Sequence, residues 1–213
     1  MEERTIGVGP WQGPRPQEVR YDPQLLEQGD RRNVVDRYRY WTEEAVRADL
    51  AQRRAREWPG AELHVAVEGF RHDLNAGSVA RTANAANAAG FHVVADRRWN
   101  RRGAMATDRY LPVHHHAGAV ELLAWAQERA LPVVGLDNAP GARQLETSPL
   151  PRRCVLVVGS EGAGLSPQLL AGCELLVQIA QFGSTRSLNA GAAAAVAVHA
   201  WLRQHAFGQR PPA

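Results

Sequence analysis

Short runs of branched apolar residues alternate with longer alanine-rich stretches from residue 61 to the end of the chain. The short runs have the length and composition of β-strands, and the longer stretches have the apolar spacing of helices. Strands that alternate with helices predict a parallel sheet covered by helices on both faces, and therefore an α/β fold. The predicted strands are residues 63–67, 91–95, 111–113, 133–136, 154–158 and 175–179, and the predicted helices are residues 75–89, 119–130, a short piece from residue 166, and 187–205.

The first 60 residues follow a different pattern. Glycine and proline are dense up to residue 24, which predicts a tail or an extended arm. Residues 31–41 then interleave arginines with aromatic side chains, a mixture that can bind phosphates and stack on bases, or can pack its rings on the main domain. Thr42 is the predicted cap of a helix with Glu43 and Glu44 in its first turn. We expect a partly extended N-terminal arm and helix over residues 1–60, which could contact RNA or a second copy of the chain, and a second domain over residues 61–213.

The composition is that of a globular protein that neither crosses a membrane nor depends on disulfides. The 213 residues are 45% apolar and 22% charged, which argues against disorder throughout the chain. The longest weakly polar stretch, residues 189–202, is shorter than the roughly 18–20 residues that a membrane span needs. The first residues are acidic and then rich in glycine and proline, unlike a signal peptide. Two cysteines are too few for a disulfide framework or a cysteine-based zinc site, so we expect a reduced, cytoplasmic protein.

All 25 basic residues are arginines, against 22 acidic residues, and the formal net charge is +3. Arginine is the better residue for bidentate contacts with phosphate and for stacking on bases. A GC-rich genome that favours arginine codons would give the same bias. The composition therefore points only weakly to RNA or DNA.

Three segments at the carboxyl ends of predicted strands contain the candidate chemistry, because open α/β sheets place their ligands there. In the first, residues 72–82, Asn75, Ser78 and Arg81 are spaced by three and share one face of the predicted helix. An amide, a hydroxyl and a guanidinium on one strip form a polar, cationic surface suited to phosphate. Taken alone, Asn75 is also typical of a helix cap, and Arg81 of a solvated charge.

The second segment, residues 157–167, runs from an apolar strand into a glycine-rich turn whose missing side chains would let the backbone approach a ligand. It lacks the ending of a P-loop and the spacing of a nucleophile elbow. The Glu161 carboxylate suits a cationic or hydroxyl-bearing ligand better than ATP. The alternative is an ordinary strand-to-helix turn, with Ser166 as the cap and Pro167 at the first helical position.

The third segment, residues 179–191, runs into an alanine-rich helix. Ser187 is the predicted cap of this helix, and a helix amino terminus is a ready site for a carboxylate. The small residues through Ala197 would let another helix pack closely. By itself this segment indicates no particular function.

Together, the three segments resemble the three motifs of the SpoU (TrmH-like) branch of the SPOUT RNA methyltransferases. The resemblance covers residues 63–205, with the order and spacing of the motifs intact. Residues 97–110 are similar to a subgroup found in actinobacteria. Residues 180–182 depart from the family, because they are Ala-Gln-Phe where the family usually has Ile-Pro-Met, which affects the shape of the cofactor pocket. The matching positions are Asn75 and Arg81 in the first motif, Gly159, Glu161, Gly164, Leu165 and Ser166 in the second, and Ser187, Leu188 and Asn189 in the third.

The resemblance implies a carboxyl-terminal trefoil knot that binds S-adenosylmethionine, and a homodimer that completes each site. The family transfers a methyl group to a ribose 2′-hydroxyl of tRNA or ribosomal RNA without a metal. Both ribosomal RNA and tRNA stay open as substrates, and ribosomal RNA is slightly favoured here because no large separate recognition domain is visible in the sequence. The implied cofactor contacts, mainly through backbone atoms, are at Leu136, Gly159, Ser160, Ile179, Ser187 and Leu188.

Arg81 matches the arginine that is essential in the family and often proposed as the base. A guanidinium has a pKa above about 12 and is not expected to lose its proton. Our hypothesis is that Arg81 binds the adjacent phosphate and stabilises the charge developing on the ribose oxygen, while phosphate or water takes the proton. By family analogy it acts on cofactor held by the partner subunit. The same analogy has Asn75 orient Arg81 or the ribose, Glu161 and Asn189 hold the site together, and Ser187 contact cofactor or substrate.

A cluster of arginines supplies the predicted RNA-docking surface, although a solvated basic loop would have the same sequence. These residues are Arg97, Arg98, Arg101 and Arg102. An RNA-binding protein that kept the fold and lost catalysis is the alternative function. The altered residues 180–182 favour it, and the intact motifs oppose it.

Two further functions find less support in the sequence. Residues 114–116 are three consecutive histidines, which suggests a metal site. Consecutive residues of an extended segment alternate faces, so the three imidazoles cannot easily converge and we expect no metal. A nucleotide-dependent oxidoreductase fits the α/β pattern but would need a glycine fingerprint that the chain lacks.

Overall fold

The computed structural model describes residues 7–70, 73–95, 109–160, 162–209 and 211. The chain divides into two compact units, residues 1–53 and 54–213, and the division falls within helix α2 (Glu43–Glu57). Throughout the described residues, every helix is too short or too polar to cross a membrane.

The first unit is folded on itself. Two antiparallel bridges, Val8 to Asp30 and Tyr21 to Trp41, tie its segments together. Its regular elements are α1 (Pro23–Gln28), the 3-10 turn η1 (Asp36–Tyr38) and the first part of α2. The prediction of a tail or extended arm up to residue 24 is therefore wrong, because the bridges hold residues 8 and 21 against the rest of the unit.

Aromatic side chains form the centre of this unit. Trp41 contacts Tyr38 edge-on, with ring centroids 5.5 Å apart. The rings of this segment pack on other rings of the first unit, and the contacts with phosphates and bases that the segment could make stay a prediction. The rings in mutual contact are Trp11, Tyr21, Tyr38, Tyr40 and Trp41.

A fully buried carboxylate, Asp30, organises the backbone around these rings. It accepts hydrogen bonds from Nη2 of Arg32 at 2.6 Å and from the backbone N of Tyr40 at 2.9 Å. Burial would raise the pKa of Asp30, but these hydrogen bonds outweigh burial and hold the pKa below its usual value. The predicted cap of the next helix is confirmed, since Oγ1 of Thr42 accepts from the backbone N of Ala45 at 3.1 Å.

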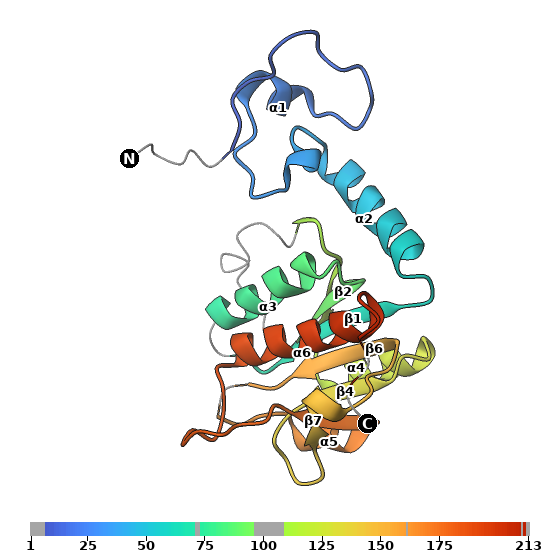
Figure 1. The fold of residues 1–213 in the computed structure, drawn as a ribbon, viewed down its shortest axis with the longest axis vertical. Helices are drawn as coiled ribbons and strands as arrows, with labels where there is room; N and C mark the ends of the chain where they lie inside the picture. Colours follow the sequence, from blue (N-terminus) through green and yellow to red (C-terminus); the bar gives the residue numbers. More distant parts are fainter. Residues whose placement is uncertain (1–6, 71–72, 96–108, 161, 210, 212–213) are drawn as a thin grey trace. The chain divides into compact units, whose positions relative to one another are not determined.

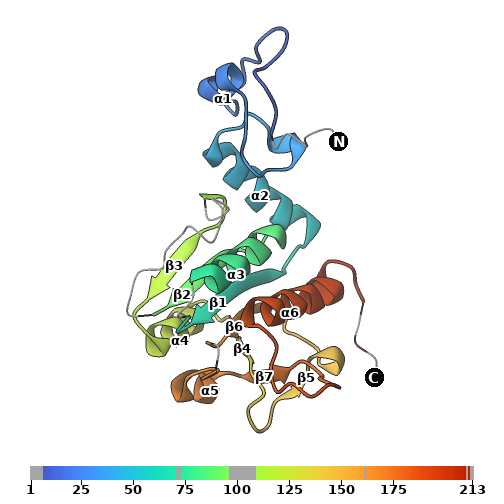
Figure 2. The ribbon, with the colours of Figure 1, turned by 90° about the vertical axis from the view of Figure 1, so that its left-hand side faces the viewer.

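The second unit is built on seven parallel strands in the order β3-β2-β1-β6-β4-β7-β5 (Figures 1 and 2). This confirms the predicted α/β fold with a parallel sheet. The central strands β1 and β6 are buried along nearly their whole length, which is why their sequences are almost continuously apolar. The strands are β1 (Glu62–Glu68), β2 (Gly90–Val94), β3 (Val113–His116), β4 (Val133–Leu136), β5 (Arg143–Gln144), β6 (Arg153–Val158) and β7 (Leu175–Gln178).

Helices cover both faces of this sheet. α3 and α6 lie side by side on one face, as both ribbon views show (Figures 1 and 2), and share a core with Val65 and Val67 of β1. α4 and α5 pack on the other face against Ala66 and Val157. The helices of this unit are α3 (Asp73–Ala85), α4 (Ala119–Glu128), α5 (Pro167–Gly172) and α6 (Ala190–His205), with a 3-10 turn η4 (Leu145–Thr147).

Most predicted elements of this unit are found close to their predicted bounds, but the strand predicted at residues 111–113 is wrong. Leu111 is buried, yet it precedes the strand, and β3 runs through the histidines at residues 114–116. These histidines pair with β2, with His92 opposite His114 in the register. The tertiary contacts of their rings, described next, explain why a run of histidines forms a strand.

Buried histidines form a row across β1, β2 and β3. Nδ1 of His64 lies 3.0 Å from Nε2 of His92, and Nδ1 of His92 lies 2.9 Å from Nε2 of His116. Oε1 of Glu62 ends the row, 3.1 Å from Nε2 of His64. Trp125 of α4 covers the rings, with its centroid 4.3 Å from that of His92.

The row of imidazoles has one direction, because a carboxylate can only accept a hydrogen bond. Glu62 accepts from Nε2 of His64, and each following histidine donates from Nε2 to Nδ1 of the one before it. His64 and His92 each accept at Nδ1 and are therefore neutral, and burial lowers the pKa of His116. Burial, together with the neighbouring histidines, lowers the pKa of His92 to about 2.

Residues 114–116 alternate between the two faces of the sheet, as predicted. His114 and His116 stack on His92, and His115 between them is exposed. Across the described ranges, no group of three or more His, Cys, Asp or Glu side chains is arranged to hold a metal.

We expect the free energy of unfolding to fall as the pH drops below about 6.5, the pKa of a histidine in an unfolded chain. Because His92 stays neutral in the fold, unfolding takes up a proton there, which contributes about 1.4 kcal/mol per pH unit. Urea unfolding at a series of pH values measures this slope. His92→Asn should reduce the slope by about one proton. A free energy of unfolding that is flat through this range would contradict the neutral row.

Candidate functional site

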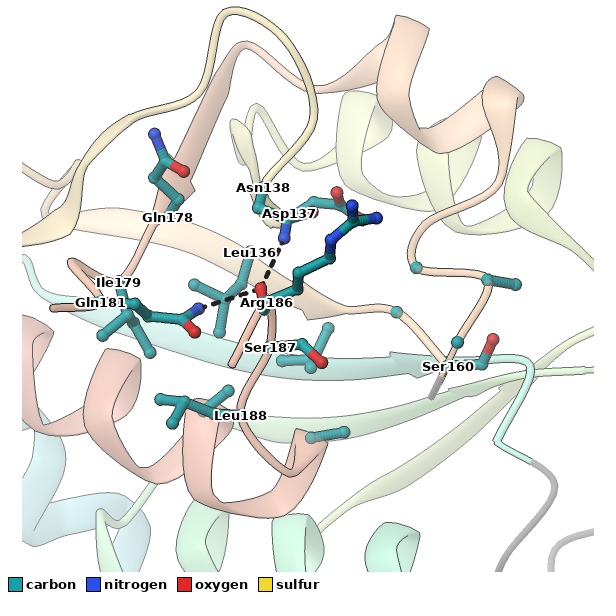
Figure 3. Close-up of a pocket in the computed structure, with 17 residues that line it drawn as sticks. Leu136, Asp137, Asn138, Ser160, Gln178, Ile179, Gln181, Arg186, Ser187 and Leu188 are labelled. Carbon is teal, nitrogen blue, oxygen red and sulfur yellow. Dashed lines mark hydrogen bonds between the residues drawn. The ribbon is translucent and has the colours of Figure 1, made fainter. Parts of the chain in front are cut away.

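A cavity of about 430 Å³ lies at the carboxyl ends of β4, β6 and β7, beside the start of α6 (Figure 3). Leu136 at the end of β4, Gly159 after β6 and Ile179 after β7 contribute to its walls. Parallel strands end at one edge of their sheet, which brings residues far apart in the sequence together here. The six predicted cofactor contacts all line this cavity: Leu136, Gly159, Ser160, Ile179, Ser187 and Leu188.

The glycine-rich turn after β6 closes on itself. Ser160 and Gly164 exchange backbone hydrogen bonds of 3.1 and 2.9 Å. A Cβ at Gly159 would overlap with the backbone of Gly164, and a Cβ at Gly164, whose φ is +68°, would overlap with Oδ2 of Asp137. The missing side chains therefore let the chain approach itself. Both glycines also line the cavity, so the expectation that they serve the approach of a ligand stays a prediction.

Two carboxylates hold this turn from neighbouring parts of the sheet. Oδ2 of Asp137, directly after β4, accepts from the backbone N of Leu165 at 2.8 Å, and Oε2 of Glu68, at the end of β1, accepts from that of Ser166 at 2.7 Å. The Ser166 side chain caps α5, and Pro167 follows at the first helical position, which confirms that part of the prediction. Sequence reasoning missed both carboxylates, although each stands at the carboxyl end of a predicted strand, where ligands are expected.

A pair of amides joins the beginnings of α3 and α6. Nδ2 of Asn189 donates to Oδ1 of Asn75 at 3.3 Å, while Oδ1 of Asn189 accepts from the backbone N of Ala192 at 3.1 Å. Asn189 is therefore the cap of α6, and the predicted cap at Ser187 is wrong. Asn75 does not open α3, because that helix begins at Asp73.

Residues with small side chains make the rest of the contact between these helices. A Cβ on Gly191 would lie 3.2 Å from Oγ of Ser78, which leaves no room for a larger residue without movement of a neighbour. The predicted close packing of a helix against the small residues of α6 is confirmed. The buried alanines at the contact are Ala76, Ala80 and Ala83 of α3 and Ala190, Ala194 and Ala197 of α6.

The segment between β7 and α6 is held at the cavity by two amide side chains. Nδ2 of Asn138 and Nε2 of Gln181 both donate to the carbonyl of Arg186, at 3.0 and 3.3 Å (Figure 3). Asp137 and Asn138 directly follow a predicted strand, and this position could have identified them as residues of the site. Gln181 belongs to residues 180–182, whose effect on the cofactor pocket is predicted, and it lines the cavity. The cavity-lining polar residues missed by sequence reasoning are Asp137, Asn138, Gln178 and Arg186.

The family model that matches this chain is that of the SpoU rRNA Methylase family, over residues 62–199. The chain belongs to this family. The match begins at the first residue of β1 and ends within α6, so it contains the whole sheet and every described residue that lines the cavity. The resemblance to SpoU proteins is confirmed, and residues 1–61 form an N-terminal extension to the matched region.

Three SpoU-type relatives illustrate the likeness. An uncharacterized tRNA/rRNA methyltransferase of Mycolicibacterium paratuberculosis is 34% identical over 164 residues, which are 73% of this chain and 51% of that protein. This chain therefore spans about half the length of that relative. A 23S rRNA (guanosine-2′-O-)-methyltransferase of Pseudomonas syringae pv. tomato is 27% identical over 157 residues, which are 71% of this chain and 62% of that protein. The SpoU methyltransferase AviRb from Streptomyces viridochromogenes, in complex with AdoMet, has a TM-score of 0.62 and 26% identity over 68% of this chain and 58% of that one. Mycobacterial relatives agree with the predicted likeness to an actinobacterial subgroup.

The structure brings together only some of the residues that the SpoU motifs single out. Asn75 and Asn189 meet at the helix junction, and Ser187 lines the cavity. Arg81 is exposed on α3 and is not among the described residues that line the cavity of its own chain. Glu161 lies outside the described residues, as do the predicted RNA-docking residues Arg97, Arg98, Arg101 and Arg102.

Replacing Gly159 by alanine should destabilise this SpoU domain by about 2 kcal/mol or more, because the added methyl group would overlap with the backbone of Gly164. Gly183→Ala is the matched control, since a Cβ there meets nothing within 4 Å, and it should change the free energy of unfolding by less than about 0.5 kcal/mol. Urea unfolding of the three proteins gives both values. A Gly159→Ala variant as stable as the wild type would mean that the turn does not close in this way.

Proposed function

We propose that this protein is an S-adenosylmethionine-dependent methyltransferase that modifies a ribose 2′-hydroxyl in structured RNA. The observation that carries the proposal is one cavity lined by all six residues at which the SpoU motifs imply cofactor contacts. Membership of the family and the AdoMet-bound structure of the Streptomyces relative support it. Ribosomal RNA is the expected substrate, in line with the name of the Pseudomonas relative.

The cavity fits this cofactor in size and in chemistry. Its volume of about 430 Å³ is within the usual range for cavities that hold small molecules. Leu136, Ile179 and Leu188 offer apolar surface to an adenine ring, and the backbone near Gly159 offers hydrogen-bonding groups. When bound, the cofactor would supply a methyl group activated on a sulfonium, whose transfer to the ribose oxygen leaves a neutral thioether.

The residues of the chain then have to position the ribose and manage its proton. Positioning alone accounts for several kcal/mol of a barrier, by effective molarities of about 10⁵ M and above. We assign to Arg81 the binding of the adjacent phosphate and the stabilisation of charge on the 2′-oxygen, while the proton passes to a phosphate oxygen or to water. Asn75 and Asn189, joined by their hydrogen bond, fix the position of α3 and of Arg81 on it. Glu161 is assigned to holding the site together, and Ser187 to contacting cofactor or substrate.

We further propose that two copies of the chain complete each site. Arg81 is exposed and is not among the described residues of its own chain's cavity, so it is available to the cavity of a partner. Leu74 on α3 and Val196 on α6 are apolar side chains with exposed fractions of 78% and 42%, and a second copy would cover them.

The trefoil knot remains part of the proposal, and two contacts support it. Oε1 of Glu146 accepts from the backbone N of Ala180 at 3.1 Å, and Asn138 donates to the carbonyl of Arg186 at 3.0 Å. The segment before α6 therefore lies against two parts of the stretch between β4 and β6, one directly after β4 and one in η4. Such contacts are expected of chain segments that are threaded through one another.

Calorimetric titration with S-adenosylhomocysteine tests the cofactor assignment. We expect saturable binding of one ligand per chain, because the cavity offers both the apolar and the backbone contacts that the ligand needs. ATP, which shares the adenosine but adds three phosphates, is the control ligand and should bind more weakly. No heat of binding at millimolar S-adenosylhomocysteine would remove the catalytic assignment and leave an RNA-binding protein of the same fold.

Methyl transfer to RNA from a strain that lacks this protein tests the role of Arg81. We expect ribose methylation of ribosomal RNA, and a turnover at least about 100-fold lower for Arg81→Lys, because lysine keeps the charge but loses the bidentate fork. Arg203→Lys, which replaces an exposed arginine in the last turn of α6, is the control and should keep the wild-type turnover.

Near-wild-type turnover of Arg81→Lys would contradict the bidentate role of the guanidinium. Methylation of tRNA in place of ribosomal RNA would overturn the substrate assignment while leaving the reaction intact. The two outcomes are independent of each other, since one concerns the rate and the other the identity of the labelled RNA.

A further inference from the structure

Two charged side chains line the cavity within the described part of the chain, and they have opposite sign. Asp137 directly follows β4, and Arg186 belongs to the segment that leads into α6. Figure 3 shows the Arg186 side chain extending from its backbone toward the side of the cavity where Asp137 and Asn138 stand. The other described lining residues are apolar or neutral polar. A bound molecule would therefore meet one positive and one negative group.

The backbone of each residue is fixed, while its charged group is left for a ligand. The carbonyl of Arg186 accepts from Asn138 and Gln181, and its guanidinium is part of an exposed side chain. The backbone N of Asp137 donates to the carbonyl of Val177 at 3.0 Å, and only its Oδ2 is used, by Leu165. Among the described residues, no ion pair involves Asp137 or Arg186. The pair is thus built into the wall without being neutralised there.

The proposed cofactor has a matching pair of charges on its amino-acid end, an α-carboxylate and an α-ammonium group. A guanidinium binds a carboxylate through two parallel hydrogen bonds, and a carboxylate binds an ammonium group by a charge-assisted hydrogen bond. Resting on the proposed function, we propose that Arg186 binds the α-carboxylate and Asp137 the α-ammonium of the bound S-adenosylmethionine. The neutral remainder of the cavity is left to the adenosine.

This assignment makes the two residues specific for one part of the ligand. S-adenosylhomocysteine contains both the adenosine and the amino-acid end, whereas 5′-methylthioadenosine contains the adenosine and thioether alone. Loss of a group that reads the amino-acid end should weaken binding of the first and leave binding of the second unchanged. Comparing the two ligands therefore distinguishes a residue that binds the amino-acid end from one that only maintains the shape of the cavity.

Calorimetric titration of the full chain with both ligands is the test. We expect Arg186→Gln and Asp137→Asn each to weaken binding of S-adenosylhomocysteine about 10-fold or more, and to change binding of 5′-methylthioadenosine less than about 2-fold. Asp137→Asn keeps an oxygen that can accept from Leu165. Arg203→Gln is the matched control for loss of an exposed arginine and should change neither affinity.

Each other outcome has a distinct meaning. Equal weakening of both ligands by Arg186→Gln would overturn the proposal and assign the residue to the shape of the cavity. Unchanged affinity for both ligands, together with weaker RNA binding, would overturn it and assign Arg186 to an RNA phosphate. Asp137→Asn could also lower the thermal stability. If this variant still binds 5′-methylthioadenosine as the wild type does, its cavity is intact. If it no longer binds 5′-methylthioadenosine, the proposal for Asp137 is overturned and the residue is assigned to holding the turn at Leu165. Failure of the wild type to bind either ligand would instead refute the proposed function.

Discussion

The close contact between α3 and α6 is the constraint on which the functional end of the domain depends. Their facing surfaces are alanine and glycine, and Gly191 already meets Ser78 at a distance that admits no larger side chain without movement. At the end of the contact, Asn189 caps α6 and at the same time binds Asn75 of α3. The start of α6 is therefore fixed in two ways. Because the preceding segment supplies Ser187 and Leu188 to the cavity, the helix contact also sets one wall of the site.

The opposite wall is fixed by a different interaction, the binding of backbone amides by carboxylates. Glu68 and Asp137 hold the consecutive amides of Leu165 and Ser166 at the end of the glycine-rich turn. Hydrogen bonds to a charged acceptor are stronger than those between neutral groups, so the turn is held more firmly than a bare loop. A site whose walls are set before the ligand arrives loses less entropy on binding. The turn is thus a preorganised surface, and Gly164 is required because it lies against Asp137.

The sequence predicts this site better than it predicts the local structure around it. The strand at residues 133–136 is found where its apolar run predicts it, because a fully buried strand has a strong and simple pattern. The strand predicted at residues 111–113 is misplaced, because the histidines that follow it form β3 through contacts between their rings and those of His92 and Trp125. Ser187 and Asn189 are equally good helix caps by type, and only the contact with Asn75 selects the second. Such choices are tertiary, and no local pattern contains them.

The sheet separates the part that limits stability from the part that binds a ligand. The histidine row crosses β3, β2 and β1, whereas the cavity lies at the ends of the next three strands of the sheet, β6, β4 and β7. A proton that enters the row at low pH must break a buried hydrogen bond and so favours the unfolded chain. None of the described residues that line the cavity is a histidine. Acid should therefore destabilise the fold through the histidine row, at strands other than those that end at the cavity.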